Sequence, residues 1–352
     1  MPPADPVKLM LEGERLMTIC NSCRYCEGYC AVFPAMEQRR EFPPADLRYL
    51  ANLCHNCAEC YYACQYAPPH EFAVNIPKIL AEIRLQSYEH YAWPKSFARA
   101  FQRNGLTVSI LLAVLVTPAF LKTKQAAGTF YDIISHATMV TLFGLAGALV
   151  FIACLIGFNR FWKDSGANVK PGAILPALRH IFTLEYLRSA GTGCTYPDEH
   201  HSHARRWFHH LTFYGFLLCF AATCVAAFYD NILGWQAPYR VLSLPVILGT
   251  TGGLGLLIGP AGLLALKRKR DRAIVDPKQD GMDVAFIALL LLTSSTGLAL
   301  LALRETSWMA PMLSIHLALI LILFLTLPYG KFVHGIYRAA ALIRYAAERR
   351  NS

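Results

Sequence analysis

The chain has 352 residues, of which 55% are hydrophobic, and it carries a formal net charge of +10. A composition this apolar excludes an ordinary soluble enzyme. Residues 1–104 hold eleven Lys+Arg and eleven Asp+Glu, so the whole net charge belongs to residues 105–352. Nucleic-acid binding is the usual expectation for a basic chain. Here the basic residues stand between long apolar stretches, which favours a membrane protein that binds no nucleic acid.

The first 104 residues are predicted to form one small soluble domain. Residues 1–19 have the pattern of an amphipathic helix, with neither the basic start nor the long apolar run of a secretory signal. Residues 71–90 have the apolar spacing of another helix. Trp93-Pro94 should end that helix, because the residue before a proline disfavours the helical conformation. The basic, aromatic segment that follows is typical of a helix lying on a membrane surface.

Eight of the twelve cysteines lie in this domain, in two copies of the spacing C-x2-C-x2-C-x3-C. The first copy is Cys20, Cys23, Cys26 and Cys30, and the second is Cys54, Cys57, Cys60 and Cys64. In ferredoxins with two [4Fe–4S] clusters, three closely spaced thiolates hold one cluster and the fourth cysteine ligates the other. The spacing therefore predicts one cluster on Cys20, Cys23, Cys26 and Cys64, and a second on Cys54, Cys57, Cys60 and Cys30.

Two other uses of these cysteines compete with iron–sulfur clusters. Structural zinc commonly takes two C-x2-C pairs and would leave the third cysteine of each triplet unused. Disulfides suit small secreted domains, but no signal peptide precedes this stretch. Clusters are favoured because the complete pattern occurs twice. One feature departs from bacterial ferredoxins, which have a proline directly after the fourth cysteine, whereas Pro34 and Pro68 come four residues later.

Six apolar stretches in residues 105–352 predict a six-helix transmembrane bundle, and with it a mainly α fold. They cover residues 105–121, 133–158, 207–229, 241–266, 284–303 and 311–330. Each is near or above the ~17–25 residues that cross a bilayer. The connections after the second, fourth and sixth stretches hold 18 Lys+Arg, whereas the other three hold four. Since positive residues stay in the cytoplasm, both termini and the clusters are expected on the cytoplasmic side of a bacterial-type inner membrane.

Histidines at the ends of these stretches are candidate haem ligands, because polar side chains inside lipid are costly and usually functional. His136 and His316 are expected near the outer surface, and the other three, His209, His210 and His334, near the inner one. On one continuous helix, His316 and His334 would share a face about 27 Å apart, close to the ~30 Å hydrocarbon thickness. The pattern predicts that His136 pairs with His316, and that His334 pairs with His210 or, less favoured, His209. Such pairs are the usual ligands of b-type haem, here one or two. The alternative is that some of them are packing or interfacial histidines.

The inner connection, residues 159–206, is longer than a simple loop requires. It holds Cys194, His200, His201 and His203, whose spacing matches no standard metal site. A polar surface loop is the favoured interpretation, and a metal site is the alternative. The chain has no nucleotide-binding glycine motif and no nucleophile motif, so a self-contained dehydrogenase would lack its two-electron cofactor.

A family resemblance rests on the two cysteine motifs, the segment RRWFHHLTFYGFLLCFAAT at residues 205–223, and the six apolar stretches. Together they resemble the tricarballylate/citrate utilisation protein B family. The resemblance implies an iron–sulfur and haem-containing membrane protein that reoxidises the FAD of a partner dehydrogenase and passes electrons toward the quinone pool. The chain is thus expected to be an electron-transfer subunit rather than a catalyst. A membrane-bound redox sensor is the alternative, but it needs an output domain or a nucleic-acid surface, and the N-terminal domain, whose net charge is zero, offers neither.

Overall fold

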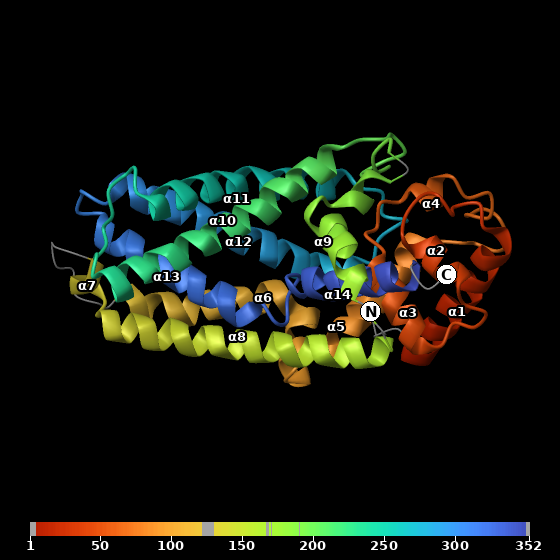
Figure 1. Cartoon of the computed structure of the whole chain (residues 1–352), viewed down its shortest axis with the longest axis horizontal. Helices are drawn as coiled ribbons and strands as arrows, with labels where there is room; N and C mark the ends of the chain where they lie inside the picture. The colour runs from red at the N-terminus through yellow and green to blue at the C-terminus, as the bar shows by residue number, and fades with distance from the viewer. Residues whose placement is uncertain (1–4, 122–129, 167–168, 170, 190, 350–352) are drawn as a thin grey trace.

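The computed structural model describes residues 5–121, 130–166, 169, 171–189 and 191–349 (Figure 1). Within these residues the secondary structure is helical, apart from one isolated bridge between Cys194 and Ser202. Six helices are long and apolar enough to cross a membrane, and they coincide with the six predicted stretches. The predicted mainly α fold, with a small domain before a six-helix membrane part, is therefore confirmed.

The N-terminal domain is a group of five helices at one end of the molecule (Figure 1). They are α1 (Pro6–Cys23), α2 (Val32–Glu37), α3 (Pro44–Leu53), α4 (Glu59–Tyr62) and α5 (Ile76–Tyr91). Asp5 and Asn75 begin α1 and α5, because their side chains accept hydrogen bonds from backbone N–H groups in the first turn. The irregular segments between these short helices carry most of the cysteines.

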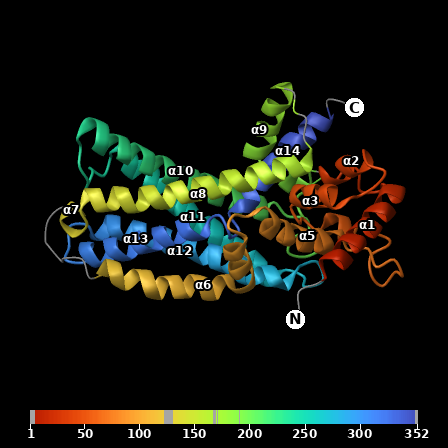
Figure 2. The same cartoon turned by 90° about the horizontal axis from the view of Figure 1, so that it is seen from below.

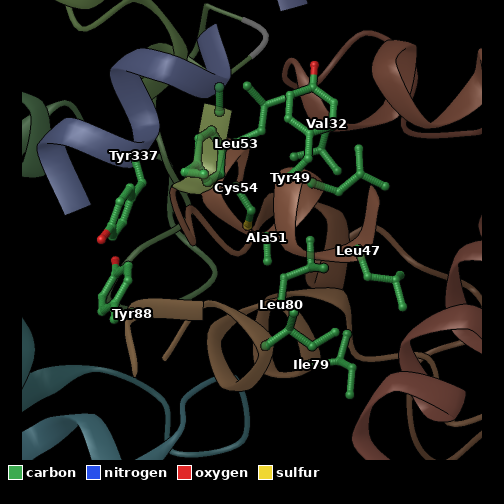
Figure 3. Close-up of a cluster of buried hydrophobic side chains, with 14 of the residues drawn as sticks. Val32, Leu47, Tyr49, Ala51, Leu53, Cys54, Ile79, Leu80, Tyr88 and Tyr337 are labelled. Carbon is green, nitrogen blue, oxygen red and sulfur yellow. The ribbon is translucent and has the colours of Figure 1, made fainter. Parts of the chain in front are cut away.

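The core of this domain is shared with the C-terminal helix α14 (Val333–Arg349). Figure 3 shows side chains of α3 and α5, among them Tyr49 and Leu80, gathered in one apolar cluster beside α14. The Tyr88 ring of α5 lies 5.8 Å from the Tyr337 ring of α14. Chain segments some 250 residues apart in sequence thus form one core, and α14 connects the cysteine-rich domain to the bundle.

The membrane part consists of α6 (Lys95–Leu121), α8 (His136–Ser165), α10 (Ala204–Leu233), α11 (Leu244–Lys269), α12 (Asp280–Leu303) and α13 (Met309–Thr326). Their long axes run side by side (Figures 1 and 2). Within α6, Asn104 has non-helical angles and separates the basic segment from the first span. Helices α10 and α11 approach closely at Gly252, where an added Cβ would lie 2.8 Å from Gly215 O.

One expectation about the last span is wrong. His316 and His334 do not lie on one continuous helix, because α13 ends at Thr326 and α14 begins at Val333. Pro328 stands in this break; it has no N–H to donate, and its ring would clash with the carbonyl of the preceding turn. The 100° per residue of a single helix therefore does not relate the directions of the two side chains. The expectation that His316 and His334 share one helix face is wrong.

The remaining short elements lie toward one end of the bundle or the other. They are α7 (Phe130–Ile133), α9 (Ile174–Phe182), and three 3-10 turns at Pro171–Ala173, Glu185–Arg188 and Pro277–Gln279. Helix α9, in the long connection of residues 159–206, packs against α14.

Ion pairs join the C-terminal helix to the N-terminal domain: Arg344 contacts Asp46 at 2.9 Å, and Arg39 contacts Glu348 at 2.5 Å.

Candidate metal centres

The first predicted cysteine set surrounds one cavity. Cys20, Cys23, Cys26 and Cys64 all line a space of about 220 Å³. Helix α1 ends at Cys23, and Arg24 then takes a left-handed conformation (φ 56°), which turns the chain so that Cys26 returns toward the helix end. A single zinc ion, held at about 2.3 Å by four sulfurs, does not require a cavity of this size. A cube of four irons and four sulfides suits it better.

The second predicted set also surrounds one space. Cys30, Cys54, Cys57 and Cys60 line a smaller cavity of about 10 Å³. Cys54 follows the last turn of α3, and its sulfur accepts a hydrogen bond from the backbone N–H of Asn56 at 3.4 Å. Asn56 and Ala58 both have positive φ, so the backbone winds tightly between Cys54 and Cys57. The structure thus places both sets as the motif spacing predicts, although Cys60 also borders the first cavity.

Burial favours the neutral thiol at two cysteines of the first set. Burial raises the pKa of Cys20 and of Cys26 to about 12, and the neighbouring thiols raise both further in the same direction. A metal ion binds the thiolate and displaces the proton. Eight sulfurs in two sets of four, of which two are buried and five half-buried, are a donor set that fits two iron–sulfur clusters by number and spacing. The cavity volume supports a cluster at the first site alone.

The two sites differ in their access to solvent. At the first, Cys23 is exposed and Tyr25 beside it is 66% exposed. At the second, Cys54 and Cys57 are buried, and the connection of residues 159–206 packs over Cys57. Thr195 donates a hydrogen bond to the carbonyl oxygen of Cys57 at 3.3 Å. The first site is therefore accessible from outside the protein, whereas the second is enclosed between the N-terminal domain and the bundle.

Cys194 is placed differently from either sequence-based interpretation. It is fully buried, and its sulfur lies within 4.8 Å of ligand atoms of Cys57 and His55. It does not lie with its neighbours in sequence, since His200 and His203 are exposed and His201 faces Glu59 at 3.6 Å. One feature of the sequence relates to this placement, the glycine directly before Cys194. In the structure Gly193 has φ 103°, and an added Cβ would lie 2.7 Å from the backbone of Ser202.

Arginines connect the second cysteine set to the bundle. Arg205, in α10, donates to the carbonyl oxygens of Asn56 at 2.7 Å and His55 at 2.8 Å. Arg338, in α14, donates to the carbonyl oxygen of Cys54. The segment that carries Cys54 is thus bonded directly to the membrane helix α10 and to the C-terminal helix α14.

One pair of predicted histidines meets at the end of the bundle next to the cysteine-rich domain. The rings of His209 and His334 lie 5.9 Å apart, with planes at 28°. The Nδ1 atom of His334 is 2.5 Å from the carbonyl oxygen of Lys331. Because a carbonyl only accepts, the proton sits on Nδ1 and leaves Nε2 able to bind a metal. His209 Nδ1 is buried without a hydrogen-bond partner in the described residues. Two imidazoles from two helices are the donor set that would hold a b-type haem.

The other predicted histidines have separate partners. His210, favoured over His209 by the sequence, stacks on Tyr214 instead of facing His334. His136 Nε2 is 2.5 Å from Asp230 of α10. His316 Nδ1 is 3.0 Å from the hydroxyl of Thr296 in α12. His136 and His316 thus contact different helices. The pairing of these two histidines stays a prediction that their contacts do not favour.

A cysteine-rich domain joined to six apolar helices defines a multi-pass membrane protein of the iron–sulfur type. Comparison with known proteins agrees. The family described as Citrate utilization protein B matches residues 100–352, and its Fer4-like domain matches residues 13–90. The chain is 51% identical to the Citrate utilization protein B of Escherichia coli over 350 residues, which is 96% of this chain and 92% of that protein. The chain therefore belongs to the citrate utilization protein B family. No solved structure matches it.

Proposed function

We propose that this protein takes electrons from the reduced FAD of a partner dehydrogenase and delivers them to the membrane quinone pool. The proposed route uses two [4Fe–4S] clusters on the cysteine sets and one b-type haem on His209 and His334. The substrate of the partner is a tricarboxylate such as citrate or tricarballylate. This substrate class follows from the family alone, because no substrate-binding motif was found in this chain.

One observation carries the proposal: the second cysteine set and the histidine pair are linked through the same two helices. Arg205 and Arg338 bond the segment that carries Cys54. His209 follows Arg205 by four residues on α10, and His334 precedes Arg338 by four residues on α14. Four residues are about one helical turn, or roughly 6 Å along the axis. Each arginine is thus one turn away from a histidine on the same face of its helix.

The chemistry balances with a quinone as the oxidant. A reduced flavin gives up two electrons and two protons, and a quinone takes up two of each to become a quinol. Iron–sulfur clusters and haem, when bound, carry one electron at a time. The residues of this chain hold these groups in a fixed order, with the exposed cysteine set facing the flavoprotein and the enclosed set beside the histidines. In the described residues we find no site for the two-electron step itself.

The proposed orientation places the clusters, both termini and the histidine pair on the cytoplasmic side of an inner membrane. It rests on the 18 Lys+Arg in the inner connections against four in the outer ones. Fusion of a reporter to the C-terminus should give activity only when the reporter works in the cytoplasm. A reporter active only in the periplasm would overturn this topology.

The decisive experiment mixes the purified protein with an FAD-dependent dehydrogenase and its tricarboxylate substrate, without oxygen. Cluster and haem spectra should change only when the dehydrogenase is present, and they should reverse when quinone is added. Substrate oxidation by this chain alone would make it an enzyme in its own right. Redox changes that alter the partner's activity without net electron flow would make it a sensor. Either outcome would contradict the proposal.

A further inference from the structure

Three arginines converge on the short backbone segment between Ala51 and Asn56. Arg84 of α5 donates to the carbonyl oxygens of Ala51 and Cys54. Arg338 of α14 donates to the same oxygen of Cys54. Arg205 of α10 bonds the next two carbonyls. Guanidinium groups from three separate helices therefore surround the loop that carries the second cysteine set.

These three charges lack the carboxylate partners that several other enclosed arginines have. Arg39, Arg48 and Arg344 each contact a carboxylate within 3 Å. In the described part of the chain, Arg84, Arg205 and Arg338 form no ion pair; they donate to neutral carbonyls, and Arg205 also lies 4.4 Å from the centre of the Tyr196 ring.

Arg84 is only 6% exposed. Arg338 Nε is buried without a hydrogen-bond partner in the described residues. Buried charges are normally paired, so this arrangement calls for an anion beside it.

We propose that Arg84, Arg205 and Arg338 form a cationic collar around the second cluster, and that the collar gives this cluster a higher reduction potential than the first. The proposal rests on the function proposed above. A cluster held by four thiolates is an anion, and reduction adds one more negative charge. Net charge and surroundings set the potential of such clusters. Enclosure alone would oppose the added charge, and three nearby cations offset that cost.

At the first site one arginine bonds a carbonyl of the cysteine motif: Arg24, which is exposed, donates to the carbonyl oxygen of Asn21 at 3.0 Å. Neither cavity has Lys or Arg among the described residues that line it. The difference between the sites is that three arginines bond the loop of the second set, against one exposed arginine at the first. The clusters are therefore unequal, although their sequence motifs are identical. The difference sets a direction: an electron entering at the exposed first site is drawn to the enclosed second site, next to the histidine pair.

Simple capping of α3 is the competing explanation. Ala51 O and Cys54 O belong to the last turn of that helix, where carbonyls lack partners and basic side chains commonly bond them. Capping would change stability but leave the potentials of the clusters unaltered. Replacement by Gln keeps a donor and removes the charge, whereas replacement by Lys keeps the charge, so the two variants separate the explanations.

The test is an anaerobic redox titration of the full-length protein, followed by electron paramagnetic resonance. Arg205→Gln and Arg338→Gln should lower the midpoint potential of one cluster and leave the other unchanged. We expect at least a tenfold loss in the equilibrium constant for its reduction, which is 59 mV for a one-electron couple. The corresponding Lys variants should recover most of the shift. A Cys23→Ser background, which disturbs the first site, identifies the affected signal as that of the second cluster.

Arg160→Gln is the matched control. Arg160 also donates only to carbonyl oxygens, those of Tyr91 and Ala92, but at the far end of α5, and its loss should leave both potentials unchanged. Unchanged potentials in the Gln variants, with full iron content, would overturn the collar. So would equal shifts in the Gln and Lys variants. If the Gln variants lose iron, the Lys variants should retain it, and loss in both would also count against the collar.

The titration needs neither flavoprotein nor quinone. A failure of the collar is therefore distinguishable from a failure of the proposed function, which would appear as an absence of cluster signals in the unaltered protein or of electron flow from the flavoprotein.

Discussion

An ion pair between Arg48 and Asp164 joins the cysteine-rich domain to the inner end of the second span. Arg48 contacts both carboxylate oxygens, at 2.9 and 3.1 Å, and the Tyr91 hydroxyl donates to the same carboxylate at 2.5 Å. The side chains of Arg48 and Asp164 are 14% and 24% exposed. Exposed ion pairs contribute ~0–1 kcal/mol, whereas removing one partner of a buried pair costs ~3–5 kcal/mol. We expect Asp164→Asn to lower the free energy of unfolding by about 2–3 kcal/mol.

The measurement is denaturant unfolding of the detergent-solubilised protein, combined with a double-mutant cycle that includes Arg48→Met. The coupling energy between the two sites should be about 1–2 kcal/mol. Glu89→Gln is the matched control, because its pair with Arg99 is more exposed, at 32% and 52%; we expect it to cost less than about 1 kcal/mol. A coupling energy near zero, or an equal effect of the control, would refute the view that this ion pair holds the domain in place.

Three other outcomes are expected. Cys57→Ser should remove about half of the roughly eight cluster irons, as measured by iron and acid-labile sulfide analysis; stoichiometric zinc in the unaltered protein would contradict the cluster assignment. His209→Ala should abolish the b-type haem spectrum while His210→Ala retains it, and the reverse result would restore the ligand that the sequence favoured. Gly252→Leu should destabilise the bundle by at least about 1–3 kcal/mol, since its Cβ would meet backbone of α10. Gly147→Leu, with open space around its Cβ, should leave thermal stability nearly unchanged.

Local sequence features predicted the main parts of this protein. The length of each apolar stretch predicts a span, because the bilayer thickness is constant and the helical rise is regular. The spacing of the cysteines anticipates which four share a cavity, since ligands two or three residues apart are confined by the turns between them. Cys64 lies with Cys20 and Cys30 with Cys60, as the motif indicates. These features depend on near neighbours in the chain and hardly on the rest of the fold.

Histidine pairing was beyond the sequence, because it depends on how helices rotate about their axes. Adjacent residues on a helix point about 100° apart, so His209 and His210 cannot both face the same partner. Only the packing of α10 against its neighbours decides that His209 faces His334. The break between α13 and α14 also depends on tertiary structure. Pro328 disfavours a continuous helix, but the direction of α14 after the break is set by its packing on the N-terminal domain.

The surroundings of the second cysteine set were decided by tertiary structure alone. Arg84, Arg205 and Arg338 are separated by more than 100 residues from one to the next, and nothing in their local sequence distinguishes them from ordinary basic residues at the inner membrane surface. Cys194 was likewise indistinguishable from a loop cysteine. The three arginines and Cys194 converge on the loop of Cys54 and Cys57 because four parts of the chain pack around it. These parts are α5, α10, α14 and the connection of residues 159–206. The sequence by itself determined which cysteines share a cavity and where the apolar helices lie, since both follow from local spacing. Which charges surround each site depends on long-range packing.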